Sequence, residues 1–142
     1  MSKANRAQPT QDSLSYQPPV PIQAMLHAIH QNQTPYFAWL ATGLSDQHLG
    51  ILGPVIEAQG SDGHLQNLDL SNNPDITDAS VPRIIGLIQN SAIEWLDLSD
   101  TSITTAGIER IAEAVYQGNR EISIVFSADL TITARQSRRI RP

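Results

Sequence analysis

The chain has 142 residues, of which 40% are hydrophobic and 16% are charged, a composition typical of a folded domain rather than of a disordered chain. It contains no cysteine, which excludes disulfides, thiolate metal sites and a cysteine nucleophile. Residues 18–134 hold three of the nine basic residues and thirteen of the fourteen acidic ones, and this net charge of −10 argues against nucleic-acid binding by that part of the chain.

The first 18 residues are polar, contain several Gln, Ser and Pro residues and offer little to bury, so we expect a mobile N-terminal segment. They lack the apolar run of a Sec signal peptide, and no stretch of the chain approaches the roughly 18–20 apolar residues needed to span a bilayer. We therefore expect a cytoplasmic protein, or one exported into a host cell without such a signal. Residues 19–142 are expected to form a single domain.

A helix is expected at residues 21–32, where apolar residues recur at intervals of three and four. They are Ile22, Met25, Leu26 and Ile29. We interpret this helix as an N-terminal cap. Residues 35–60 then predict a strand at 37–39 and a helix that begins near Ser45. The apolar face of that second helix consists of Leu49, Leu52, Val55 and Ile56.

Residues 65–90 and 93–119 are two copies of one pattern, in which three apolar positions recur at a shift of 28 residues. They are Leu65, Leu68 and Leu70 in the first copy and Ile93, Leu96 and Leu98 in the second. A fixed period of this length is typical of repeat architectures. Each copy starts with a strand-like alternation and continues with a helical pattern, whose N-caps are expected at Thr77 and Thr104.

A single strand–turn–helix unit cannot bury both its strand face and its helix face, whereas stacked units can. We therefore predict an α/β fold in which parallel strands form one sheet and the helices lie on one side of it. After residue 119, Ile124-Val125-Phe126 predicts a further strand and residues 133–140 predict a more polar final helix. Residues 121–142 would then form a degenerate capping repeat.

The first copy contains the segment LQNLDLSNN, which ends at Asn73. This segment resembles the LxxLxLxxN motif of the leucine-rich repeat family, and the long unit with its helix is similar to the ribonuclease-inhibitor-like subclass. The resemblance implies a short solenoid with a parallel concave sheet and convex helices, and a binding function. It also implies that Asn73 bonds neighbouring backbone inside its turn. The second copy departs from the motif, because Thr101 stands at the matching place.

The strand pattern places alternate side chains of each strand on the side away from the helices. Together with residues at the strand ends, they form a candidate surface for binding a protein partner without catalysis. Its residues are Tyr36, Leu40, Asn67, Asp69, Ser71, Trp95, Asp97, Ser99 and Asp100. Neighbouring strands lie about 4.8 Å apart, so Asp69 and Asp97 should be side by side. Trp95 next to these carboxylates would suit a partner that carries Arg or Lys.

Two other interpretations of this surface stay open. LDLS is a common form of the leucine-rich repeat strand, so the Asp and Ser residues would then only be solvated. Paired carboxylates would also serve an enzyme in acid–base catalysis, but no nucleophile with a base, no Gly-rich phosphate loop and no metal-ligand spacing accompanies them. We therefore expect no cofactor and no metal site, and we interpret His27 and His30 as exposed helix residues.

Further alternatives concern the two ends of the chain. A short repeat protein with a Ser-, Gln- and Pro-rich N-terminus is similar to bacterial effectors that bind a host protein. The chain would instead be one piece of a larger repeat array if an apolar end were exposed beyond Ile124 and Phe126. The segment from Arg135 to Arg141 contains four arginines, which would cap the last repeat, dock onto an acidic surface or contact a phosphate.

Overall fold

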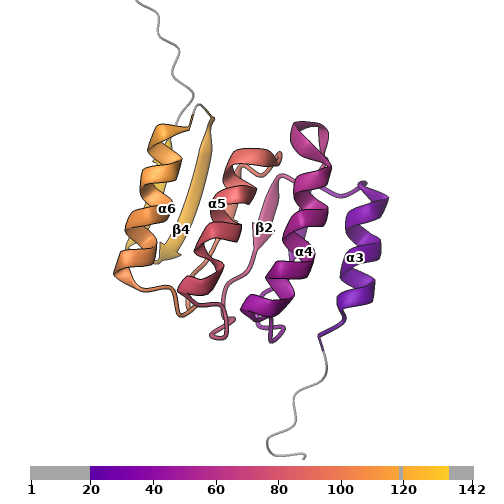
Figure 1. Cartoon of the computed structure of the whole chain (residues 1–142), viewed down its shortest axis with the longest axis horizontal. Helices are drawn as coiled ribbons and strands as arrows, with labels where there is room; N and C mark the ends of the chain where they lie inside the picture. Colours follow the sequence, from indigo (N-terminus) through magenta and orange to yellow (C-terminus); the bar gives the residue numbers. More distant parts are fainter. Residues whose placement is uncertain (1–19, 119, 135–142) are drawn as a thin grey trace, which may run out of the picture.

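The computed structural model describes residues 20–118 and 120–134. In this part of the chain the helices lie side by side over one face of a single sheet (Figure 1). The α-helices are α3 (Ile22–Gln31), α4 (Asp46–Ala58), α5 (Val81–Asn90) and α6 (Thr105–Gln117), and the 3-10 helices are η1 (Gly60–Asp62) and η2 (Asp78–Ser80). The strands are β1 (Tyr36–Ala38), β2 (Asn67–Asp69), β3 (Trp95–Asp97), β4 (Ile122–Ser127) and β5 (Leu130–Ala134). The predicted α/β class is therefore confirmed.

The sheet has the order β1-β2-β3-β4-β5, so strands that are neighbours in the chain are also neighbours in space. β1 to β4 are parallel, and their inward-facing residues pair in one register. These residues are Phe37, Leu68, Leu96 and Ile124, all buried in the core between sheet and helices. A helix connects each parallel strand to the next, because parallel neighbours need a long crossover.

β5 is antiparallel to β4, so the sheet is mixed and the prediction of an all-parallel sheet is wrong at this edge. The reason is the two-residue turn Ala128-Asp129, since so short a link permits only antiparallel neighbours. The predicted final helix is contradicted at its start, because Thr133 and Ala134 belong to β5. The rest of that predicted helix, residues 135–142, lies outside the described residues.

The segment Thr131-Ile132-Thr133 explains why this part of the chain is a strand. All three residues are β-branched, which favours extended backbone over helix. Ile132 is buried on the helix side of the sheet, whereas both threonines are exposed on the other side. The alternation of buried and exposed side chains therefore determines the local structure here. The prediction of a helix missed it, because it extended the pattern of the earlier repeats into this segment.

Capping side chains begin the helical segments of the repeats. Ser45 and His48 form a capping box at the start of α4, in which the Ser45 amide donates to Nδ1 of His48 at 3.1 Å. Thr104 caps α6, and Thr77 caps η2, so both threonines have the N-cap role predicted from the sequence. In the first copy the α-helix itself begins only at Val81, after one 3-10 turn.

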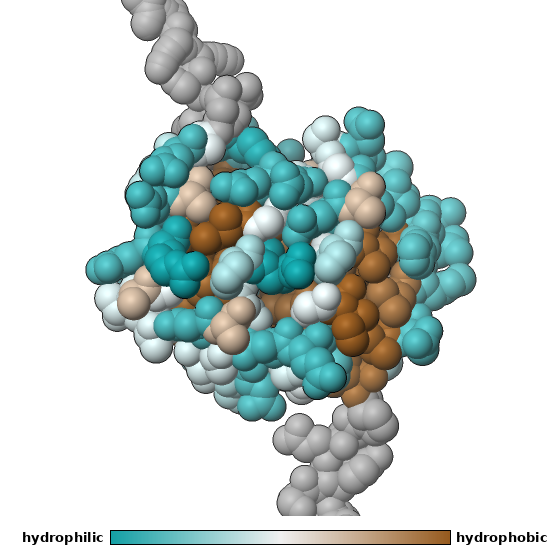
Figure 2. All heavy atoms as spheres, viewed as in Figure 1, coloured by the Kyte–Doolittle hydropathy of each residue, from teal (hydrophilic) through white to brown (hydrophobic). Residues whose placement is uncertain are grey.

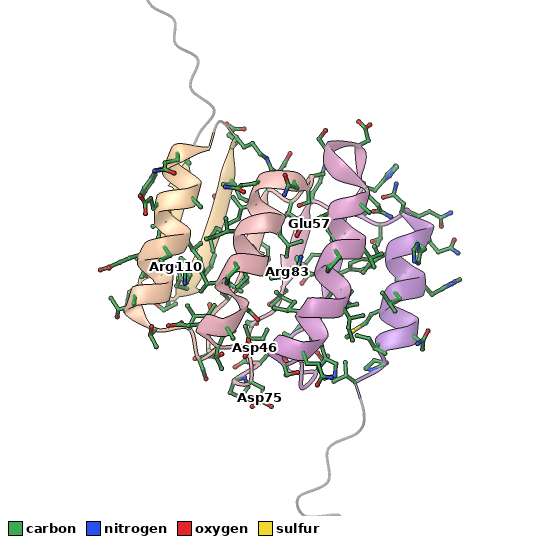
Figure 3. All side chains as sticks on the ribbon, in the orientation of Figure 1. Asp46, Glu57, Asp75, Arg83 and Arg110 are labelled. Atoms are coloured by element: carbon green, nitrogen blue, oxygen red, sulfur yellow. The ribbon has the colours of Figure 1, made fainter. Side chains whose placement is uncertain are left out.

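An ion pair joins α4 and α5, with Oε2 of Glu57 3.4 Å from Nη1 of Arg83 (Figure 3). The stem of Arg83 crosses Gly53 of α4, where a Cβ atom would overlap Cδ of Arg83. Glu57 in turn lies over Gly86 of α5, where a Cβ atom would be 2.5 Å from its Oε2. The two glycines therefore make room for a polar pair between closely packed helices.

Candidate functional site

Every second side chain of the strands lies on the side of the sheet away from the helices. The strand register aligns these side chains in two rows across the sheet. The first row is Tyr36, Asn67, Trp95, Ser123 and Thr133, and the second row is Ala38, Asp69, Asp97, Val125 and Thr131. We call these residues, together with Leu40 two residues after the end of β1, the open face.

Asp69 and Asp97 are paired in the register of β2 and β3, and both are half-buried. Oδ1 of Asp69 accepts hydrogen bonds from the amide and the hydroxyl of Ser71, at 3.0 and 2.6 Å. Oδ1 of Asp97 accepts the equivalent bonds from Ser99, at 2.9 and 2.6 Å. No described residue donates a hydrogen bond to Oδ2 of either carboxylate. Oδ1 of each carboxylate thus holds a turn, whereas Oδ2 accepts no hydrogen bond from the described residues.

These bonds place the serines differently from the prediction. Ser71 was expected to face outward, but only 5% of its surface is exposed, and Ser99 is half-buried. The strands end at Asp69 and Asp97, so the alternation that would turn the serines outward stops there. Asp100 is exposed but belongs to the following turn, where it has a φ of 57°.

The β1 side of the open face is apolar. Tyr36 and Leu40 are 46% and 41% exposed, and Ala38 between them is also exposed. Trp95 lies two strands away in the first row, next to Asn67, and both are half-buried. The open face therefore presents an apolar border on β1 and a carboxylate pair at its centre.

Asn73 lies fully buried in the turn after β2. Its Oδ1 accepts the amides of Thr42 and Leu44, at 3.1 and 3.0 Å. Its Nδ2 donates to the backbone carbonyls of Trp39, Leu70 and Ser71. These bonds fix the segment after β1 against the segment after β2, and so they position the apolar border next to the carboxylates. In the second copy, Oγ1 of Thr101 donates to the carbonyl of Leu98 at 2.8 Å.

Sequence reasoning missed a set of carboxylates that join successive units on the helix side. Asp46 accepts the amide and hydroxyl of Thr77, at 2.8 and 2.6 Å, and the hydroxyl of Ser80 at 2.5 Å. Asp78 accepts the amide of Thr104 at 2.7 Å, and its hydroxyl as well. The signal was present in the sequence, since Asp46 directly follows the capping Ser45 and Asp78 directly follows the capping Thr77.

The electrostatics of these two carboxylates match a linking role. Burial acts to raise the pKa of Asp46, but hydrogen bonds from Ser80 and Thr77 outweigh it and lower the pKa below its ordinary value of 3.8. Hydrogen bonds from Thr104 likewise lower the pKa of Asp78. Both carboxylates are therefore ionised near neutral pH, where they are the best acceptors for these donors.

Among the residues that the structure describes, groups that would support catalysis do not gather around the carboxylate pair. The hydroxyls of Ser71 and Ser99 donate to the aspartates, and His48 belongs to the cap of α4. Within residues 20–118 and 120–134, no group of three or more His, Cys, Asp or Glu residues is arranged to hold a metal ion. Across the same residues, no helix is long and apolar enough to cross a membrane.

The helix side of the molecule offers a second apolar area. Figure 2 shows this side, on which hydrophilic residues predominate but an apolar patch lies over α3 and α4. The apolar side chains of these helices that keep contact with solvent include Ile22, Leu26, Ile51 and Val55. Ile51 is 42% exposed, so this patch is a second candidate surface for binding, beside the open face.

The chain matches no protein-family model and no curated protein sequence. A solved structure described as "Leiomodin-1 Actin-Binding Site 2 (ABS2)" has a similar fold, with a TM-score of 0.61 and 20% sequence identity. The similarity covers 76% of this chain and 62% of that chain, so this chain spans less than two thirds of the leiomodin-1 chain. At this identity the similarity extends to the fold alone.

Proposed function

We propose that the chain is a non-catalytic binding module and that its protein partner contacts the open face of the sheet. One observation carries this proposal: the open face combines exposed apolar side chains on β1 with two carboxylates. The Oδ2 atoms of these carboxylates accept no hydrogen bond from any described residue. The helices cover the opposite face of the sheet (Figure 1). Among the described elements, none lies over the open face.

The residue types on the open face suit protein recognition. Protein interfaces draw most of their binding energy from a few side chains, among which Trp, Tyr and Arg predominate. Tyr36 and Trp95 lie in the same row of the sheet. The hydrogen-bonded sheet fixes the backbone that carries these rings, so binding does not require that this backbone be ordered.

The architecture that we propose for this module is a short solenoid of the leucine-rich repeat type, with α3 as the N-terminal cap. Successive strand–turn–helix units pair in register, and Asn73, Asp46 and Asp78 each bond backbone or side chains of a neighbouring unit. Contacts between adjacent units are what stabilise a repeat array. In this proposal β5 closes the array at its C-terminal side.

The alternatives gain less support. Acid–base catalysis gains little support, because the Ser71 and Ser99 hydroxyls donate to Asp69 and Asp97 and, within the described residues, no group of three or more His, Cys, Asp or Glu residues is arranged to hold a metal ion. β5 pairs with β4, so Ile124 and Phe126 are buried and form no exposed apolar end that would favour a continued array. The effector-like alternative depends on residues 1–18, which lie outside the described residues. The leiomodin-1 structure is described as an actin-binding site, which supports protein binding as a class of function and names no partner for this chain.

An affinity pull-down from source-cell lysate tests the proposal, with the full chain as bait. The test variant combines Trp95→Ala with Asp97→Asn, and the control is Tyr116→Ala, which removes an aromatic ring that is 64% exposed on α6. We expect proteins retained by the wild type and the control to be lost with the test variant. Retention of the same proteins by the test variant, with its fold intact by circular dichroism, would contradict the proposal.

A further inference from the structure

We infer that the partner presents an extended segment in which an apolar residue and an arginine or lysine stand two positions apart. The basic side chain lies between Asp69 and Asp97, and the apolar side chain lies on the β1 border formed by Tyr36, Ala38 and Leu40. This inference rests on the proposed function and adds the chemistry of the partner.

Charge complementarity is the first argument. The open face carries two carboxylates and no Lys, Arg or His residue. All three described arginines are engaged or located elsewhere: Arg83 pairs with Glu57, Arg120 donates to the carbonyls of Ile88 and Ile93, and Arg110 lies on α6. The carboxylate pair thus lacks a cation within the described residues, and a cation from the partner would supply it.

The fixed geometry of the carboxylates is the second argument. The amide and hydroxyl of the serine two residues later hold Oδ1 of each aspartate, so the side chains are oriented before a partner arrives. The strands are about 4.8 Å apart, a spacing at which one guanidinium or ammonium group reaches both Oδ2 atoms. Trp95 precedes Asp97 by two residues on the same side of β3, where its ring would contact the stem or the charged group of the basic side chain.

The third argument is the position of the apolar border. In β1 the acid and serine of the repeat are replaced by Ala38 and Leu40, so this strand offers apolar contact instead of charge. At a strand spacing of about 4.8 Å, the border lies about 7 Å from the midpoint between β2 and β3. Residues two apart in an extended chain are separated by about 6.8 Å and point to the same side. A segment that crosses the strands therefore places both side chains at once.

Selection from a random-peptide library displayed on phage tests this inference, with the full chain as the target. We expect the selected peptides to be enriched in an apolar residue two positions from Arg or Lys. Their affinity should fall roughly tenfold or more in the variant Asp69→Asn with Asp97→Asn, because Asn retains the Oδ1 acceptor and loses the charge. The control variant, Glu109→Gln with Glu113→Gln on α6, removes the same number of charges and should bind as the wild type does.

Salt dependence provides a second measurement that needs no variant. Binding of the selected peptides to the wild type should weaken steadily as ionic strength rises, because the contacts between charges are partly exposed to solvent. Affinity that does not change with salt would overturn the inference, whatever the folding of the variants.

The remaining outcomes separate this inference from the proposed function. Peptides without basic residues whose binding is lost with Trp95→Ala would overturn the inference and leave the proposed function in place. Peptides bound equally by the wild type, the Asn variant and Trp95→Ala would overturn both. If basic peptides are selected only when the four arginines from Arg135 to Arg141 are changed to Gln, the occupant of the face is the chain's own C-terminal segment, and the inferred partner segment is overturned.

Discussion

The two oxygens of the Asp97 carboxylate have different surroundings. Oδ1 holds the end of β3 through the amide and hydroxyl of Ser99, whereas Oδ2 bonds to no described residue. A short side chain with an oxygen acceptor is needed for this bond, since Asp or Asn reaches the backbone two residues later and Glu does not fit the same turn. The LDLS segment therefore has a structural reason that is independent of any partner, and a binding role for Oδ2 is compatible with it.

Two substitutions at Asp97 separate these roles. Asp97→Ala should lower the free energy of unfolding by about 1–2 kcal/mol, because two hydrogen bonds to Ser99 are lost. Asp97→Asn should change it little, because the amide oxygen takes the place of Oδ1. Urea unfolding of both variants checks this, and an unchanged free energy of unfolding in Asp97→Ala would show that the turn bonds do not matter.

Besides the hydrophobic core, α4 and α5 share an ion pair that small residues make possible. Gly53 leaves room for the stem of Arg83, and Gly86 leaves room for the carboxylate of Glu57, so a reciprocal fit exists between α4 and α5. Gly50 lies one turn from Gly53 on the same helix, but a Cβ atom there would meet no other atom within 4 Å. The two glycines thus lie in the same helix, but only Gly53 has a side chain of another helix close to it.

Alanine substitutions in α4 should therefore have opposite effects. Gly50→Ala should stabilise the chain by about 0.5–1 kcal/mol, because Ala favours helix over Gly. Gly53→Ala should destabilise it by about 1 kcal/mol or more, since the displaced Arg83 costs more than the helix gains. Thermal and urea unfolding of the two variants measure the difference. A gain of stability in both would mean that Arg83 moves aside freely.

The links between units should make stability depend on pH. The pKa of Asp46 is lower in the folded chain than its ordinary value of 3.8, so folding favours the ionised form. Its stabilising effect is complete above pH 3.8 and is lost as the pH falls through the lower folded pKa. Asp46→Asn should therefore be less stable than the wild type at neutral pH, and the gap should close in strong acid. A gap that stays constant in unfolding curves down to about pH 2 would contradict the linkage.

At the scale of the whole molecule, the features that recur in every repeat unit could be predicted from the sequence. The alternation in Leu68 and Leu70 predicts a strand and its register, because every unit buries the same face. β5 was not predicted, because the register of the earlier units was extended beyond the point where the pattern of apolar residues changes to a period of two. Ser71 was misplaced because the strand alternation was continued past Asp69, where the chain already turns.

The contacts between units lie beyond what one sequence predicts. The bonds from Asp46 to Thr77 and from Asp78 to Thr104 join residues 31 and 26 positions apart, so they depend on how the units stack. The same holds for Asn73, whose acceptors and donors lie in the preceding turn as well as in its own. The part of the open face on β1 to β4 could be predicted because its residues follow from the strand period. Thr131 and Thr133 of β5 were missed with their strand, and the occupied Oδ1 atoms depend on the three-dimensional turn.

The central claim is that a protein partner contacts the open face, and site-specific photo-crosslinking in source cells tests it most directly. p-Benzoylphenylalanine is placed at Tyr36 on the open face, at Ile51 in the apolar patch of α4, or at Tyr116 on α6, all of them exposed positions. We predict a discrete crosslinked protein at position 36 that disappears with Asp69→Asn and Asp97→Asn, and no such product at positions 51 and 116. A discrete product at position 51 or 116 with none at position 36 would contradict the account.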